Sequence, residues 1–184
     1  VFVVHAATPS FSTPTSLGPG YNPNVQSSGS NVYVTWTDKS GGIFFRASSN
    51  DGATWNPALK IGNGGQIPIM SANGNDVYIV WVSNGINFVA SSDNGAAGSW
   101  TPKPVKLAPA GAITPFVASS SSVVSVVYLS GVGGGSFVTS SSNSGKNWTS
   151  PHQYSNGPEP QIAVSGTNVY VSADALDRSH IQFG

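Results

Sequence analysis

The chain contains no cysteine and very little charge. The missing cysteines exclude disulfides and thiolate metal sites. Charged residues make up 8% of the 184 positions, against roughly 25% in ordinary soluble domains, and the formal net charge is zero. Without a basic patch, nucleic acid is a poor candidate partner. No run of 18 apolar residues is present, so we predict no membrane span.

Helix-forming sequence is scarce as well. Leucine is rare, whereas 22 glycines and 13 prolines are distributed along the chain. Glycine and proline are the least favourable residues in a helix, and no segment places its apolar residues at a 3.6-residue period. The composition therefore favours an all-β protein, and the length is sufficient to bury a core.

One phrase occurs three times, as SSNDGATW, SSDNGAAGSW and SSNSGKNW, and its tryptophans are 45 and 48 residues apart. A period of this size indicates repeat architecture. In each copy glycine can supply the positive φ of a tight turn, Asn or Asp can bond to turn amides, and tryptophan offers a large apolar surface. We therefore predict a structural role for its residues: Ser48, Asn50, Gly52, Trp55, Ser91, Asp93, Gly95, Trp100, Ser141, Asn143, Gly145 and Trp148.

Extended segments repeat with a similar period. Each is opened by a proline, and the spacings are 45, 47 and 45 for Pro23, Pro68, Pro115 and Pro160. A β-rich run follows each proline: Asn31–Trp36, Asp76–Trp81, Val123–Tyr128 and Asn168–Ala173. These runs are apolar at successive positions, which is typical of strands buried on both faces. Each repeat reads as four strands, and sheets packed radially against one another form a β-propeller.

We therefore predict a single all-β propeller domain of four-stranded antiparallel blades over residues 1–184, with repeats at about 1–22, 23–67, 68–114, 115–159 and 160–184. The chain would supply two strands of one blade, three whole blades and two strands of a closing blade. Pairing of Val1–Ala7 beside Val169–Ala173 would close a four-bladed ring and remove exposed edges. A strand-like segment at His180–Phe183 competes for that position. Part of a larger propeller, or pairing with a second copy, is therefore the alternative.

The repeated phrase resembles the Asp box, Ser-x-Asp-x-Gly-x-Thr-Trp, of the sialidase-type (BNR repeat) β-propellers. Ser48, Gly52, Thr54 and Trp55 match it in place, the second copy has an insertion before its tryptophan, and two copies carry Asn instead of Asp. The resemblance implies a propeller, usually of six or seven blades. It implies little about activity, because Asp boxes also occur in domains that are not enzymes.

The residues argue against sialidase catalysis. That family holds the substrate carboxylate with three arginines, whose planar forks bind it bidentately, and this sequence has only Arg46 and Arg178. The family also pairs a tyrosine nucleophile with a glutamate, and the single glutamate here is Glu159, in a connection between blades. Three tyrosines share one repeated strand position and are predicted to be core: Tyr33, Tyr78 and Tyr170.

Other hydrolytic sites are also poorly supported. A glycosidase needs two opposed carboxylates, and Asp38 and Asp174 occupy related connections on one rim. We favour solvated turn residues over a catalytic pair. The three histidines, His5, His152 and His180, are scattered, and the sequence has neither a Gly-x-Ser-x-Gly elbow nor a calcium loop. We expect no metal site and no cofactor.

Candidate ligand-binding residues lie in the connections predicted on the face opposite the repeated phrase: Asp38, Lys39, Glu159, Asp174, Asp177, Arg178 and His180. The segment from Ala173 to His180 departs most from the repeat, and such departures are where function is most easily added to a scaffold. The alternative is that this segment is simply an exposed chain end.

We therefore predict a non-catalytic extracellular or cell-surface propeller. It would act as a scaffold, assembly or recognition module with a protein or glycan partner, and self-assembly is one form of this. The neutral Ser- and Asn-rich composition resembles that of exported β-proteins, and the first residue is Val1, so we expect a preceding segment to have been removed. The alternatives are a degenerate or partial sialidase-like glycoside hydrolase, and a segment of a surface-layer or filament protein.

Overall fold

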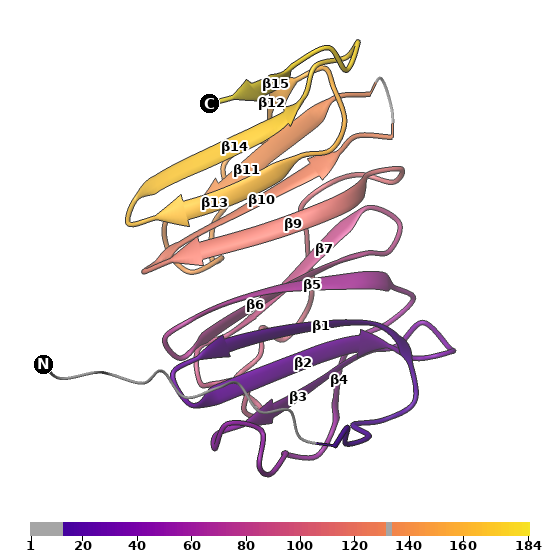
Figure 1. The fold of residues 1–184 in the computed structure, drawn as a ribbon, viewed down its shortest axis with the longest axis vertical. Helices are drawn as coiled ribbons and strands as arrows, with labels where there is room; N and C mark the ends of the chain where they lie inside the picture. Colours follow the sequence, from indigo (N-terminus) through magenta and orange to yellow (C-terminus); the bar gives the residue numbers. More distant parts are fainter. Residues whose placement is uncertain (1–12, 132–133) are drawn as a thin grey trace, which may run out of the picture.

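The computed structural model describes residues 13–131 and 134–184, which form fifteen β-strands in four sheets and contain no helix that could cross a membrane (Figure 1). The sheets are called blades 1 to 4 in chain order. Blade 1 contains β1 (Tyr21–Ser28), β2 (Asn31–Thr37), β3 (Ile43–Ser48) and β4 (Leu59–Gly62). Blade 2 contains β5 (Gln66–Asn73), β6 (Asp76–Val82), β7 (Ile86–Ser91) and β8 (Val105–Lys106). Blade 3 contains β9 (Ile113–Ser120), β10 (Val123–Leu129), β11 (Ser136–Ser141) and β12 (His152–Ser155). Blade 4 contains β13 (Gln161–Ser165), β14 (Asn168–Asp174) and β15 (Ile181–Phe183).

Neighbouring strands within every blade are antiparallel and follow one another in the chain. The second strand is strongly buried in blades 1 to 3, which explains why its sequence is largely apolar at successive positions there, whereas β14 of blade 4 is only partly buried. The fourth strand is short and lies at the sheet edge, and β8 is only two residues long. Pro102 and Pro104 cannot donate to a ladder, so they separate β8 from an isolated bridge between Ser91 and Trp100 that precedes them.

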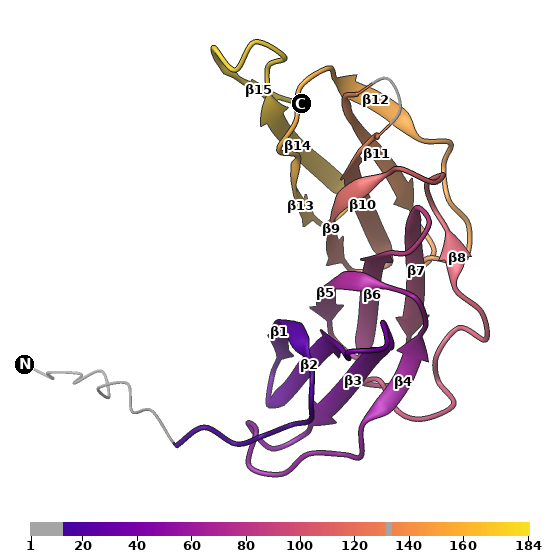
Figure 2. The same ribbon diagram turned by 90° about the vertical axis from the view of Figure 1, so that its right-hand side faces the viewer.

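The four blades are stacked along an open arc. The first strands β1, β5, β9 and β13 lie next to one another, and the fourth strands lie on the opposite side (Figures 1 and 2). Blade 1 and blade 4 are therefore at opposite ends of the molecule, separated by blades 2 and 3 (Figure 1).

Apolar side chains fill the spaces between successive blades. Tyr33 and Phe45 of blade 1 pack with Val77, Ile79 and Trp81 of blade 2, and each of these side chains is almost fully buried. A second cluster joins blades 2 and 3 through Tyr78, Val80, Phe88, Val124, Val126 and Tyr128. A sheet thus buries both of its faces only where a neighbouring blade packs on each face.

The ends of the chain differ from the expected composite blade. Blade 4 has its own third strand, β15, which pairs with β14 through Ser172 to Asp174. The edge expected to receive Val1–Ala7 is therefore occupied by β15, because the segment from His180 to Phe183 folds back locally. Residues 1–12 lie outside the described residues, and residues 13–17, expected to belong to a strand, form none.

One of the three predicted core tyrosines is exposed. Tyr33 and Tyr78 are fully buried, but Tyr170 is 40% exposed, so its prediction as a core residue is wrong. The tyrosine position faces the following blade, and among the described residues no blade follows blade 4.

The three copies of the repeated phrase form the same turn. In each blade this turn lies between the third strand and the segment that leads into the fourth strand. In each turn a buried serine hydroxyl accepts the N–H of the glycine four residues later, at 2.9 Å for Gly52, 3.0 Å for Gly95 and 2.9 Å for Gly145. In two turns the side-chain oxygen of Asn50 or Asn143 also accepts a backbone N–H four residues later, at 2.9 Å. A further backbone bond ties each turn to the hairpin between the first two strands of its blade.

Replacing Ser141 by alanine is expected to lower the free energy of unfolding by about 1–3 kcal/mol, because the buried N–H of Gly145 loses its acceptor. The neighbouring Ser142 is exposed, so Ser142→Ala is the matched control and should change stability by less than about 0.5 kcal/mol. Urea denaturation of both variants measures the difference. Equal stability of the two variants would show that the hydroxyl does not hold the turn.

Candidate functional site

Asp38 organises its own loop. Its Oδ1 accepts bonds from the backbone N–H groups of Ser40 and Gly42 and from the Ser40 hydroxyl, each at 2.8 Å. These bonds, led by that of the Ser40 hydroxyl, hold the pKa of Asp38 below its ordinary value of 3.8, and the charge of Lys60 adds a small effect in the same direction. The carboxylate is thus a structural acceptor at the turn between β2 and β3.

Stability contributed by Asp38 is expected to depend on pH. Because its pKa is lower in the folded chain than in the unfolded chain, the contribution is present above the unfolded value and is lost as pH falls through the folded value. Wild type should therefore lose stability below about pH 4, and Asp38→Asn should lose less over the same interval. Urea denaturation at a series of acidic pH values tests this. A parallel acid dependence in both proteins would contradict it.

The loop between β14 and β15 contains aspartate, serine and histidine in contact. The Ser179 hydroxyl donates to Asp177 Oδ1 at 2.7 Å and lies 2.9 Å from His180 Nδ1. In a hydrolytic triad the histidine lies between the carboxylate and the hydroxyl, whereas here the serine lies between the other two. Bonds from Ser179 lower the pKa of Asp177, and all three side chains are exposed. The arrangement stabilises a loop and does not activate a nucleophile.

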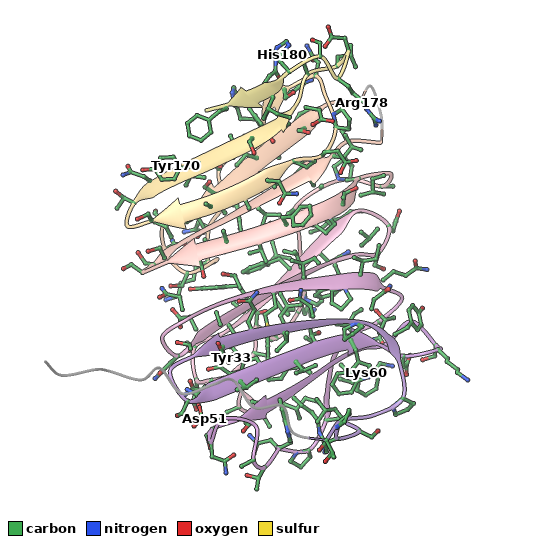
Figure 3. All side chains as sticks on the ribbon, in the orientation of Figure 1. Tyr33, Asp51, Lys60, Tyr170, Arg178 and His180 are labelled. Carbon is green, nitrogen blue, oxygen red and sulfur yellow. The ribbon has the colours of Figure 1, made fainter. Side chains whose placement is uncertain are left out.

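The predicted site residues are not brought together. Asp38 and Lys39 lie in blade 1, whereas Asp174, Asp177, Arg178 and His180 lie in blade 4 at the other end of the arc (Figures 1 and 3). The carboxylate pair of Asp38 and Asp174 considered from the sequence is therefore not formed. The open arc separates residues that a closed four-bladed ring would have placed on one rim.

Glu159 has a backbone role that the repeat explains. It has φ 59° and precedes a proline, as do Asn22 at φ 51°, Ile67 at φ 54° and Thr114 at φ 52°. Its left-handed conformation is thus a feature of every blade, at the point where the first strand begins. The side chain is exposed and accepts no hydrogen bond among the described residues.

A cleft lies elsewhere, between blades 3 and 4 on the side of the repeated turns. It has a volume of about 420 Å³ and is called the blade 3–4 cleft, lined by Val123, Ser140, Ser141, Ser142, Asn143, Asn147, Trp148, Thr149, Thr167 and Val169. No lining residue is charged. The lining instead combines an indole ring with hydroxyl and amide groups that can both donate and accept hydrogen bonds.

The corresponding cleft between blades 2 and 3 is narrower. It has a volume of about 180 Å³, and Trp100 and Thr101 stand where Trp148 and Thr149 stand in the blade 3–4 cleft. The repeated turn of blade 3, at Ser144, Gly145 and Lys146, covers its far side. Blade 4 provides no such turn among the described residues, and this leaves the blade 3–4 cleft open.

The Trp148 ring is fixed at the base of the blade 3–4 cleft. Its indole N–H donates to the Gly145 carbonyl at 3.0 Å, and its ring meets Phe88 edge-on at a centroid distance of 4.8 Å. Thr149 is held by its backbone N–H, which donates to the Ser140 carbonyl. A ligand would therefore meet a rigid aromatic surface that is already in position.

The sequence placed its candidate residues on the opposite face and did not single out Ser142, Asn147, Thr149 or Thr167, which line the blade 3–4 cleft. The repeat did signal the tryptophan, but each copy of the phrase looks the same. Only the absence of a fourth copy distinguished the space beside Trp148 from the cleft between blades 2 and 3, whose far side the following turn covers.

Comparisons with known proteins give structural likeness alone. No family model matches the sequence, and no curated protein matches it. An ulvan lyase of polysaccharide lyase family PL25, bound to -[GlcA(1-4)Rha3S]-, has a TM-score of 0.65 and 11% identity over 85% of this chain and 47% of its own. The six-bladed fucose-binding lectin of Aleuria aurantia has a TM-score of 0.61 and 10% identity, covering 88% of this chain and 61% of its own. A GH43 endo-arabinanase of Bacillus licheniformis has a TM-score of 0.51 and 17% identity over 92% of this chain and 72% of its own.

The chain thus spans about half the length of the lyase and less than two thirds of the lectin. At these identities the likeness extends to the fold and not to the activity. The sialidase-type assignment drawn from the repeated phrase has no match at the family level and stays a prediction. The predicted fold class is confirmed: the chain is an all-β protein whose antiparallel blades match part of a β-propeller.

Proposed function

We propose that this protein is a non-catalytic propeller that binds neutral carbohydrate in the blade 3–4 cleft. The observation that carries the proposal is the cleft lining, which joins the Trp148 ring to hydroxyl and amide groups and contains no charged side chain. A pyranose has an apolar C–H face that packs on an aromatic ring and hydroxyls that exchange bonds with Ser, Thr and Asn. A volume of about 420 Å³ lies within the usual range of small-ligand pockets, roughly 300–1,000 Å³.

A binding role fits the chemistry better than a catalytic one. Glycoside cleavage with acid and base requires two carboxyl groups flanking the bond, and the lining of this cleft has none. The fold is similar to that of a fucose-binding lectin as well as to carbohydrate-cleaving enzymes, so fold likeness alone supports either role. The proposed setting is extracellular or at the cell surface, where glycans are displayed.

Filling the cleft should abolish binding. Thr167 is exposed in the turn between β13 and β14, and Thr167→Phe would place an aromatic ring in the cleft. Asn75 is exposed at the equivalent turn of blade 2 and does not line this cleft, so Asn75→Phe is the matched control. A microarray of neutral oligosaccharides would identify a ligand, and calorimetry would then compare the variants with wild type.

We expect wild type and Asn75→Phe to bind the same sugar and Thr167→Phe to lose it. Two results would reject the proposal: no neutral sugar bound by wild type, or undiminished binding by Thr167→Phe. Measurement of reducing ends after prolonged incubation should show an intact ligand. Sugar cleavage would indicate the enzymatic alternative.

Removing one polar contact should weaken binding in a graded way. The Asn147 side chain is exposed to the cleft, and its backbone N–H, not its amide, holds the turn through Asn143 Oδ1 at 2.9 Å. Asn147→Ala should therefore reduce affinity by roughly two- to tenfold, the loss of one neutral hydrogen bond, without changing stability. Calorimetry with the sugar identified above, together with urea denaturation, tests both parts. A large loss of stability would mean that Asn147 acts on the turn.

A further inference from the structure

Blades 1 and 2 each present a stacked aromatic pair to the blade that follows. Tyr33 stacks on Phe45 with ring centroids 6.0 Å apart, and Tyr78 stacks on Phe88 at 6.2 Å. All four side chains are at most 1% exposed. The pairs are covered because the tryptophan in the repeated turn of the next blade packs on the phenylalanine.

The covering contact has the same geometry in both places. Trp100 meets Phe45 at 4.9 Å and 74°, and Trp148 meets Phe88 at 4.8 Å and 76°. Edge-to-face contacts of this kind stabilise beyond the area they bury. Two consecutive blades are therefore joined by a tryptophan on one side and a tyrosine–phenylalanine pair on the other.

Polar groups complete the contact between blades 1 and 2. The Tyr33 hydroxyl donates to Asn94 Oδ1 at 2.9 Å, and Asn31 Nδ2 donates to the same oxygen at 3.0 Å. Asn94 is the residue directly before Gly95 in the repeated turn. Both the turn and its tryptophan are thus held by the preceding blade.

Blade 4 has this aromatic pair without its cover. Tyr170 stacks on Phe183 with centroids 6.3 Å apart and an angle of 13° between the rings. The two side chains are 40% and 76% exposed, and Asn168 occupies the strand position held by Asn31 in blade 1. The surface formed by Tyr170, Phe183 and Asn168 is called the blade 4 acceptor.

Blade 1 has the complementary group, for which the described residues provide no partner. Trp55 is partly exposed, and among residues 13–131 and 134–184 no aromatic ring packs on it and its indole N–H forms no hydrogen bond. Asp51 is exposed directly before Gly52, at the position of Asn94 in the next turn. Figure 3 shows Asp51 and Tyr170 on the same side of the arc, at its two opposite ends.

We propose that the blade 4 acceptor of one molecule docks on blade 1 of a second copy of this chain. Trp55 would cover Phe183, and the Asp51 carboxylate would accept bonds from the Tyr170 hydroxyl and the Asn168 amide. The carboxylate makes these bonds stronger than their counterparts at Asn94. A second copy is the fitting occupant because the same chain carries both halves of a contact it already makes internally.

The contact is heterologous, since two different surfaces meet. Molecules joined this way add head to tail and form either a closed ring or an open filament. Docking at this surface does not use the blade 3–4 cleft. The proposed assembly and the proposed sugar binding can therefore be tested, and rejected, independently.

Analytical ultracentrifugation of the 184-residue chain over a range of concentrations tests the proposal. Wild type should form species heavier than the 18.8 kDa chain. Trp55→Ala and Phe183→Ser should each weaken association by roughly thirtyfold or more, the effect of losing an interface hot spot. Leu176 is 74% exposed in the loop between β14 and β15, outside the acceptor, so Leu176→Ser is the matched control and should associate like wild type.

A mixture of the two weakened variants gives the sharper result. Trp55→Ala keeps an intact acceptor and Phe183→Ser keeps an intact tryptophan, so the mixture should form a dimer that stops growing. At the concentration where the mixture dimerises, each variant alone should stay largely monomeric. Monomeric wild type at all concentrations would overturn the proposal, as would assembly unaffected by either variant or a mixture that forms no dimer.

Discussion

Replacing Trp81 by alanine is expected to lower the free energy of unfolding by about 3–5 kcal/mol. Trp81 is 1% exposed in the cluster between blades 1 and 2, and Gly62 and Gly65 approach its ring so closely that no side chain would fit at either position. Alanine would therefore leave a cavity bounded by backbone that cannot collapse into it. Such a loss is a large fraction of the 5–15 kcal/mol typical of a whole domain.

Two further variants serve as comparisons: one keeps an aromatic ring at position 81 without the indole N–H, and the other removes a partly exposed tryptophan. The Trp81 indole N–H is buried and has no partner among the described residues, so Trp81→Phe should cost much less than alanine. Trp55 lies at the open side of blade 1 and is partly exposed, so Trp55→Ala should cost about 1 kcal/mol at concentrations too low for assembly. Urea denaturation followed by circular dichroism measures all three. Similar losses for Trp81→Ala and Trp55→Ala would contradict the assignment of Trp81 to the core.

Replacing Gly95 by alanine is expected to cost about 2–5 kcal/mol, because two unfavourable effects add. Gly95 has φ +74°, which disfavours any residue with a β-carbon, and that atom would lie 2.2 Å from the Phe45 ring. The added methyl would push blade 2 away from blade 1 at the contact between Trp100 and Phe45.

Gly98 is the matched control for this effect. It lies in the same loop with φ +88°, but nothing lies within 4 Å of a β-carbon added there. Gly98→Ala should therefore lower the free energy of unfolding only through the unfavourable positive φ, by about 1–2 kcal/mol. Equal losses at the two glycines, measured by urea denaturation, would show that the clash with Phe45 relaxes without cost.

Much of the fold could be predicted from the residues. The glycine four residues after the first serine of each repeated turn has positive φ, and the second strands of blades 1 to 3 are mostly apolar, so turn and strand are set by local chemistry. The composite closing blade was predicted less well. Whether Val1–Ala7 or Ile181–Phe183 lies beside β14 depends on competition between two similar segments, and the local hairpin orders fewer residues.

The sequence did not point to the blade 3–4 cleft, for a related reason. Asp38 and Asp177 look like functional carboxylates in the sequence, but each accepts bonds from a serine two residues later and stabilises its own loop. Trp148 looks like a purely structural repeat residue, yet it lines the blade 3–4 cleft. Composition and spacing do not reveal which copy of a repeat has an open cleft beside it.

The order and internal architecture of blades 1 to 3 follow from the sequence itself, because turns and strand pairing within a blade use residues close together in the chain. The environment of each blade's faces depends on the tertiary arrangement. Tyr78 and Tyr170 occupy the same position of the repeat, but one is fully buried and the other is 40% exposed. The difference arises because burial of a blade's face requires a neighbouring blade, and among the described residues none lies on the outer side of blade 4.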